Sequence, residues 1–96
     1  MSWEVDEQFF DRAFRSWVER EQPSIDLRFV VVEWVHGLQS DPFLRARPVQ
    51  DFGDDWWFAR IRDSNTGQYV VTAVFFADPE YKLVQISVLA TLGFPI

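Results

Sequence analysis

Four arginines are the residues best suited to bind a charged ligand, and they fall in two pairs at alternate positions. Arg45 and Arg47 form the first pair, and Arg60 and Arg62 form the second. A guanidinium group presents several N–H donors in a fixed plane and binds carboxylates or phosphates through two-point contacts. The arginines therefore predict a basic patch that faces either an acidic protein or RNA.

Three aspartates between these pairs offer a second interpretation. Asp51, Asp54 and Asp55 can neutralise the arginines in a solvated surface, where each ion pair contributes only about 0–1 kcal/mol. Paired carboxylates also bind divalent cations. Adjacent residues at the entry to a strand point in opposite directions, however, so Asp54 and Asp55 do not converge on one ion. We expect this acidic cluster to be a solvated loop.

Other groups that catalyse reactions are scarce. The chain has no cysteine, which excludes disulfides, thiolate metal sites and a cysteine nucleophile. His36 is the only histidine, and it has neither the neighbouring ligands of a zinc site nor an obvious nucleophile to activate. The sequence therefore predicts no metal and no cofactor, and it favours binding over catalysis.

An aromatic run directly precedes the second arginine pair. If Trp56, Trp57 and Phe58 lie in a regular strand, one of the two tryptophans faces away from the core. Packing against a neighbouring element is one explanation, but tryptophan beside arginine is also the composition of an interface hot spot. The candidate partner-binding residues are Trp56, Phe58, Arg60, Arg62, Arg45 and Arg47.

Composition limits the kind of fold that can position these residues. The 96 residues are enough for a single domain, and the 17 Trp, Tyr and Phe rings exceed what so small a core can hide. A net charge of −6 argues against generic nucleic-acid binding. The acidic start predicts no signal peptide, and no apolar run has the length of a membrane span. We expect a cytoplasmic protein.

Two apolar stripes in the first half predict a helical hairpin. Residues 7–21 follow helical spacing, with Asp6 as N-cap and Pro23 as the stop. Residues 25–38 alternate at first like a strand, but their apolar residues also follow the face of a longer helix, and Ser24 can cap it. About 14 residues exceed the usual strand length of about 5–6, so we expect a helix here.

The second half predicts an antiparallel meander. After an irregular segment over 43–55, strands are expected at 56–62, 69–77 and 82–91, because links this short join only antiparallel neighbours. Turn residues support both links: Asn65 and Gly67 suit left-handed dihedrals, and Pro79 suits a type I turn. In the last strand the more apolar face comprises Val84, Ile86, Val88 and Ala90. The predicted fold is α+β, an N-terminal helical hairpin packed on a three- to four-stranded antiparallel sheet.

This order of elements resembles the RelE/ParE superfamily of small bacterial toxins, over nearly the whole chain. MSWEV is similar to the family's edge strand, DPFLRARPV to its linker from helix to sheet, and FARIRD to its first meander strand, where basic residues alternate. TGQYVVTAVF and KLVQISVLATLG are similar to its last two strands. The resemblance implies a protein that binds an antitoxin or a host factor and, in the ribosome-dependent nucleases, one that cleaves messenger RNA.

Several residues of that nuclease chemistry are absent. The nucleases use Lys, Arg and often Tyr or His around the sheet to hold phosphate and move protons. Arg60 and Arg62 match the alternating basic pair. Tyr69, however, is followed by Val70 where the family has an arginine, and residues 89–96 have no basic or histidine-containing tail.

The sequence therefore favours a small acidic protein-binding module that resembles a non-catalytic RelE/ParE toxin and binds an antitoxin or inhibits a host protein. Two alternatives stay open. The first is a messenger-RNA endonuclease that acts on the ribosome, which is the only route by which we expect contact with nucleic acid. The second is a structural protein that forms homo-oligomers through its exposed aromatic residues.

Overall fold

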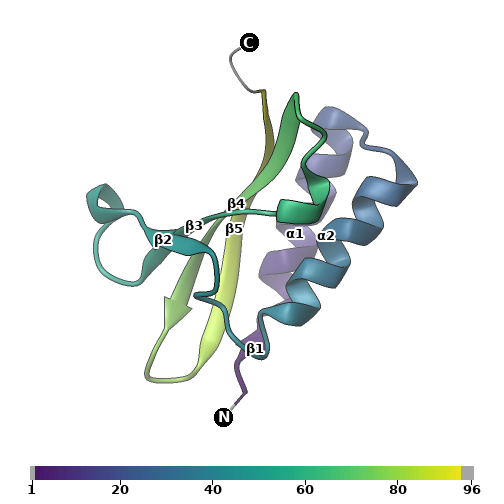
Figure 1. Ribbon diagram of the computed structural model, residues 1–96. Helices are drawn as coiled ribbons and strands as arrows, with labels where there is room; N and C mark the ends of the chain where they lie inside the picture. Colours follow the sequence, from purple (N-terminus) through teal and green to yellow (C-terminus); the bar gives the residue numbers. More distant parts are fainter. Residues whose placement is uncertain (1, 94–96) are drawn as a thin grey trace.

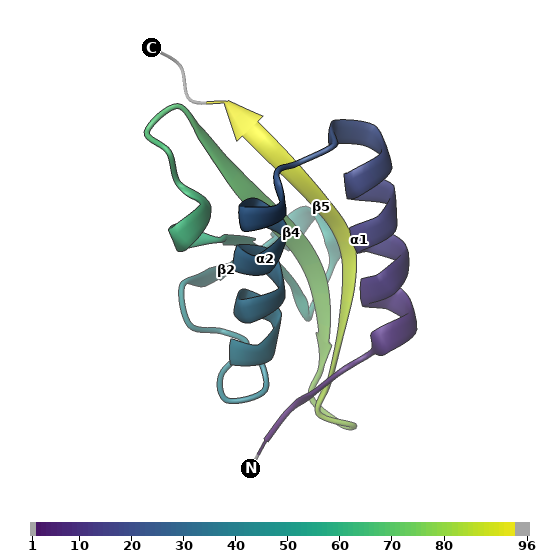
Figure 2. The same cartoon turned by 90° about the vertical axis from the view of Figure 1, so that its right-hand side faces the viewer.

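Two helices lie on one face of a five-stranded sheet (Figure 1). The computed structural model describes residues 2–93. Helix α1 spans Glu7–Glu21 and helix α2 spans Ile25–Gly37. Figure 2 looks onto the helical layer, with α1 alongside strand β5 and α2 in front of the sheet. The predicted α+β class and its N-terminal helical hairpin are confirmed.

Both helices begin at the predicted caps. The Asp6 carboxylate accepts hydrogen bonds from the first free N–H groups of α1, and the Ser24 hydroxyl accepts the Leu27 N–H at 3.2 Å. These oxygens satisfy donors that have no partner within the helix. α1 ends at Gln22, which takes the left-handed conformation at φ 47°, directly before Pro23. The strand-like alternation at the start of α2 is therefore overridden by its cap and its longer helical stripe.

The sheet has the strand order β1-β5-β4-β3-β2. The antiparallel meander comprises β3 at Trp56–Arg60, β4 at Tyr69–Asp78 and β5 at Leu83–Gly93. Two short edge strands complete it: β1 at Glu4–Val5 pairs parallel with β5, and β2 at Ala46–Pro48 pairs antiparallel with β3. The prediction of three to four strands is therefore slightly low.

Strand β2 corrects the expectation that residues 43–55 are irregular. Only three residues of this segment pair with β3, and one of them is Pro48. A three-residue strand shows no measurable alternation, and proline is tolerated in sheets mainly on edge strands, where its missing N–H does not interrupt a ladder. The short 3₁₀ helix η1 at Gln50–Phe52 follows and brings Phe52 back toward β3.

Strand β3 ends two residues before its predicted end because a serine hydroxyl enters the ladder. Arg60 is its last residue, and Arg62–Ser64 form the 3₁₀ helix η2. The Ile61 N–H still donates to the Val71 carbonyl at 2.9 Å. The reciprocal ladder bond, from the Val71 N–H to the Ile61 carbonyl, is replaced by two bonds through Ser64. The Val71 N–H donates to the Ser64 hydroxyl at 2.8 Å, and that hydroxyl donates to the Ile61 carbonyl.

The first hairpin link confirms one of its two expected left-handed residues. Gly67 has φ 88°, as predicted, but Asn65 has φ −75°, so the expectation of a left-handed Asn65 is wrong. Its side-chain oxygen instead accepts the Gly67 N–H at 2.8 Å, which is the local bond that makes asparagine frequent in turns. In the second link the Asp78 carboxylate accepts the Glu80 N–H at 2.9 Å.

A bulge in β5 reverses which side chains face the helices. Up to Ile86 the alternation follows the prediction, but a register shift against β4 then leaves Ser87 without a partner in the ladder. An extra residue in one strand moves all later side chains to the opposite face. Leu89 is therefore buried at 1% exposure, whereas Val88 is 47% exposed. Val88 and Ala90 do not share the inward face of Ile86, contrary to the prediction.

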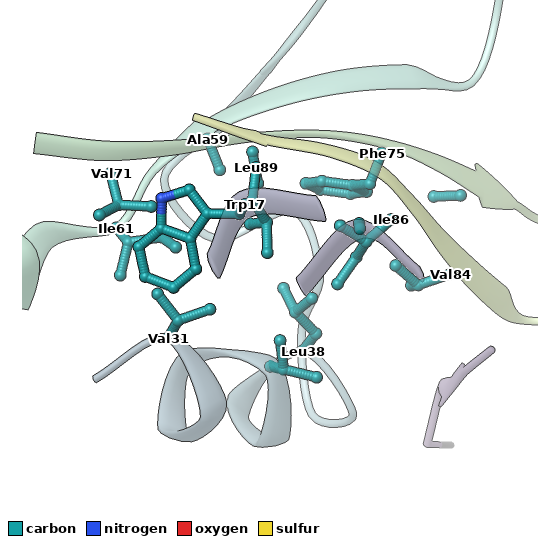
Figure 3. Packing of buried hydrophobic residues seen from close by; sticks show 14 of the residues in the cluster. Trp17, Val31, Leu38, Ala59, Ile61, Val71, Phe75, Val84, Ile86 and Leu89 are labelled. Carbon is teal, nitrogen blue, oxygen red and sulfur yellow. The ribbon is translucent and has the colours of Figure 1, made fainter. Parts of the chain in front are cut away.

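The core fills the space between the helices and the sheet (Figure 3). Trp17 of α1 is fully buried and lies among side chains from the sheet and Val31 of α2. Phe75 of β4 is also fully buried and meets the Trp34 ring at 6.2 Å between centroids. Each such ring removes about 150–250 Å² from water. The helix-facing side of the sheet therefore carries most of the stabilising burial.

Side chains of α1 close the outer edge of β5 beyond the short strand β1. The Arg20 guanidinium donates to the Leu89 carbonyl at 2.6 Å, and the Thr91 N–H donates to the Glu21 carboxylate at 3.2 Å. Arg20 and Glu21 also form an ion pair at 3.2 Å. The two side chains thus supply the acceptor and the donor that a neighbouring strand would offer, and they protect an otherwise free edge.

Candidate functional site

The sheet surface opposite the helices is the candidate functional site, and we call it the open face. Successive strand residues point to opposite sides, so the pairing register identifies its members. By this register the open face comprises Arg47, Trp56, Phe58, Arg60, Val70, Thr72, Val74, Phe76, Asp78, Leu83, Gln85, Val88, Ala90 and Leu92. Of these, Val70 and Thr72 are buried by their neighbours, at 2% and 4% exposure. Within residues 2–93, both α-helices lie on the other side of the sheet.

Aromatic side chains form a continuous row at one end of the open face. The Trp56 ring contacts Phe52 of η1 with centroids 5.9 Å apart and Phe76 of β4 with centroids 5.5 Å apart. Both contacts have the edge-to-face geometry that aromatic quadrupoles favour. Phe52 remains 58% exposed. The prediction that one of the two tryptophans faces away from the core is confirmed for Trp56.

The neighbouring Trp57 points to the helical side. Its ring meets Phe43 with centroids 4.6 Å apart, and it packs against the core. Its indole N–H is buried and has no hydrogen-bond partner among the described residues. A buried donor without an acceptor costs about 1–3 kcal/mol, so this position carries a local penalty that the aromatic contact offsets.

Arginines gather around Phe58, toward the other end of β3. The Arg47 guanidinium lies over the Phe58 ring at 5.0 Å from its centroid, a cation–π contact. Arg45, Arg47 and Arg60 line one pocket of about 190 Å³, together with Ala46 and Phe58. Among its described lining residues there is no acidic side chain. The structure therefore brings three of the four predicted arginines together at one pocket.

Arg62 departs from the predicted arrangement. We expected it to alternate with Arg60 on one strand face, but it lies in η2, outside β3. It lines a different pocket of about 260 Å³, on the side of α2, together with Asp41 and Asp63. Arg45 and Arg60 border this second pocket as well, so Arg62 remains near the other arginines without belonging to the open face.

The prediction that the arginines pair with the aspartates of 51–55 is wrong. Only Arg15 and Arg20 form ion pairs within residues 2–93. Asp54 and Asp55 precede Trp56, and Arg60 is at the far end of β3, about 13 Å beyond Trp56 at 3.3 Å per residue. The basic and acidic groups are therefore separated along the strand, and the arginine donors stay free for another partner.

The remaining candidates contribute little to this site. His36 is exposed in the last turn of α2, on the helical layer. A separate hollow of about 630 Å³ lies at β1 and is lined by acids such as Glu4 and Glu7, away from the arginines. In the described part of the chain no cluster of His, Cys, Asp and Glu is suited to a metal ion, and no helix is long and apolar enough to span a bilayer.

Several residues on or beside the open face were not identified from the sequence as candidates. Phe52 was placed in an irregular segment, and Val88 was assigned to the buried side because the bulge at Ser87 has no sequence signal. Phe76 was detectable, since it alternates with Val74 along a predicted strand. No protein-family model, curated protein or solved structure is matched by this chain.

Proposed function

We propose that this protein is a non-catalytic protein-binding module that receives its partner on the open face. The observation that carries the proposal is the combination on one surface of an aromatic row and arginines that have no ion pair within residues 2–93. The opposite side of the same sheet is covered by α1 and α2 and supplies the stability. The open face is therefore free to make contacts without being needed for the core.

The residue types fit a protein partner. Tryptophan, tyrosine and arginine are enriched among the few residues that dominate interface energetics. Trp56 offers a large ring held by two neighbours, so little side-chain freedom is lost on binding. Arg60 lies at the other end of β3, with donors that suit the carboxylates of an acidic partner.

The order of elements supports the resemblance to RelE/ParE toxins. That resemblance requires a helix over 25–38, and α2 occupies Ile25–Gly37. It also requires an edge strand before the helices and a meander after them, which correspond to β1 and to the run from β3 to β5. On this basis the proposed partner is an antitoxin or a host protein that the module inhibits.

Cleavage of messenger RNA on the ribosome is the second candidate, and the pocket of Arg45, Arg47 and Arg60 favours it. Three guanidinium groups would hold phosphate well. Guanidinium groups do not release protons in proteins, and the only other described lining residues are Ala46 and Phe58. General acid–base chemistry needs a group that moves a proton, so this pocket supports binding more than cleavage.

Tightly induced expression in bacteria, with growth scoring and recovery of co-purifying molecules, tests the proposal. Growth arrest with one stoichiometric protein and intact transcripts is the expected result. Trp56→Ala should abolish capture while the chain stays folded, whereas Phe29→Ala, a 64% exposed aromatic on α2, should not affect it. If both variants capture the partner equally well, the open face is not the binding site.

The nuclease candidate has its own readout. If growth arrest is accompanied by co-purifying ribosomes and cleaved messenger RNA, the function of the protein is catalysis and not binding. Arg45→Ala combined with Arg60→Ala should then relieve arrest. The matched control is Arg12→Ala with Arg15→Ala, which removes the same charge from the exposed side of α1.

A further inference from the structure

The pocket that Arg62 lines lies outside the open face, where the end of α2 meets the far end of β3, and we call it the Arg62 pocket. Its volume is about 260 Å³. Its apolar lining includes Leu38 and Ile61, which are 3% and 1% exposed, and the half-buried ring of Trp34. Pockets for small molecules usually measure about 300–1,000 Å³ and combine apolar walls with a few convergent polar groups. The Arg62 pocket therefore suits a ligand at the small end of that range.

Six charged side chains line the Arg62 pocket, three of each sign. They are Arg45, Arg60, Arg62, Glu33, Asp41 and Asp63. Within residues 2–93 none of the six forms an ion pair, so every one of these guanidinium nitrogens is more than 4.0 Å from the three carboxylates. The pocket thus presents cations and anions that are not already matched to one another.

The balance of these charges selects among ligands. An anion would be attracted by the arginines but repelled by the acids, and a cation would meet the reverse. A ligand that carries both charges avoids either repulsion. Helix α2 also ends at this pocket, through Gly37, and the C-terminal end of a helix has a partial negative charge that favours an ammonium group. The pocket of arginines on the open face differs, because no acid lines it.

We propose that the Arg62 pocket binds a free α-amino acid with an apolar side chain, such as leucine. The arginines donate to its carboxylate, for which the guanidinium geometry is suited. Its ammonium group donates to Glu33 and Asp41. One oxygen of Asp41 already accepts the Phe43 N–H at 3.0 Å, which leaves the other oxygen for the ligand. The apolar side chain lies against Trp34 and Leu38. This site goes beyond the proposed function, because it is not on the open face.

Isothermal titration calorimetry of the full chain with leucine and three analogues tests the proposal. Isocaproate lacks the ammonium group of leucine, isoamylamine lacks the carboxylate, and glycine lacks the apolar side chain. Leucine should bind saturably in titrations up to about 10 mM, and each analogue should bind at least about tenfold more weakly, since each loses one class of contact.

Two substitutions that remove charge but preserve shape locate the site. Glu33→Gln and Arg62→Gln should each weaken leucine binding by about tenfold or more. The matched controls on α1, Glu19→Gln and Arg12→Gln, should leave it unchanged. In heteronuclear NMR spectra of the wild-type chain, leucine should shift the amide signal of Gly37.

The proposal is overturned if leucine does not bind, or if isocaproate or isoamylamine binds as tightly as leucine. It is also overturned if both pocket variants bind leucine like the wild-type chain, or if the NMR shifts fall on the open face and not around Gly37. Capture of a partner through Trp56 uses neither Glu33 nor Arg62, so each of these results leaves the proposed function standing.

Discussion

Replacing the buried Ser64 hydroxyl should destabilise the protein through one identifiable hydrogen bond. Ser64 is 4% exposed, and its hydroxyl accepts the Val71 N–H at 2.8 Å while donating to the Ile61 carbonyl. In Ser64→Ala the Ile61 carbonyl keeps the Ser64 backbone N–H at 3.0 Å, but the Val71 N–H loses its acceptor. Val71 is fully buried, so water does not replace the hydroxyl.

The expected cost follows from that single orphaned donor. A buried unsatisfied N–H costs about 1–3 kcal/mol, and the removal of one oxygen atom leaves little additional cavity, so we expect a loss of about 2 kcal/mol in the free energy of unfolding. Urea unfolding followed by tryptophan fluorescence measures it. Hydrogen exchange at the Val71 amide should accelerate in the same variant, because that amide no longer has an acceptor.

Ser40→Ala is the matched control. Ser40 is exposed, and its side chain forms no hydrogen bond within residues 2–93, so this substitution should change stability by less than about 0.5 kcal/mol. If Ser64→Ala behaves like Ser40→Ala and the Val71 amide exchanges as slowly as before, the hydroxyl does not replace the ladder bond. The explanation for the early end of β3 would then be refuted.

Three further substitutions test separate contacts by the same unfolding measurement. Asp6→Ala removes the cap of α1 and should cost about 1 kcal/mol; an unchanged stability would show that water caps the helix equally well. Trp57→Phe keeps the aromatic contact and removes an unsatisfied N–H, so stability should stay within about 1 kcal/mol of wild type, unlike Trp57→Ala at about 3 kcal/mol. Arg20→Met removes the hydrogen bond to the Leu89 carbonyl at the edge of β5 and should cost about 1 kcal/mol. Arg15→Met should cost less, because it removes only an exposed ion pair with Asp11 within one helix turn.

The helices and the long strands were predictable because local signals agree with tertiary packing there. Asp6 and Ser24 are side chains that cap helices wherever they occur, and both do so here. The nearly continuous apolar run of β4 covers ten residues between two turns, which is typical of a strand. Where propensity, capping and periodicity point to one answer, the sequence is sufficient.

The remaining features depend on contacts between distant residues. The end of β3 is set by Ser64 bonding to Val71 across the ladder, which no spacing within β3 records. The bulge at Ser87 reverses the faces of half a strand without a glycine or proline to mark it. Strand β2 is three residues long and exists only because β3 lies beside it.

The candidate site was predicted where it follows from the two-residue period of a strand. Trp56, Phe58 and Arg60 alternate on β3 and do share the open face. Arg62 obeys the same spacing but falls beyond the strand, so the period no longer applies to it. The expected ion pairs between the arginines and Asp54 do not form for a related reason. Residues that are close in the sequence lie far apart in space when the strand between them is extended.

The composition of the open face is difficult to explain by solvation alone. An antiparallel sheet with one face in water usually alternates apolar residues inward with polar residues outward. Here the outward positions of β4 include Val74 and Phe76, β3 adds Trp56 and Phe58, and β5 adds Val88 and Leu92. Apolar surface of this extent exposes a protein to aggregation unless something covers it. Since α1 and α2 already bury the other face, these residues contribute little to the core, and substituting them should affect association far more than stability.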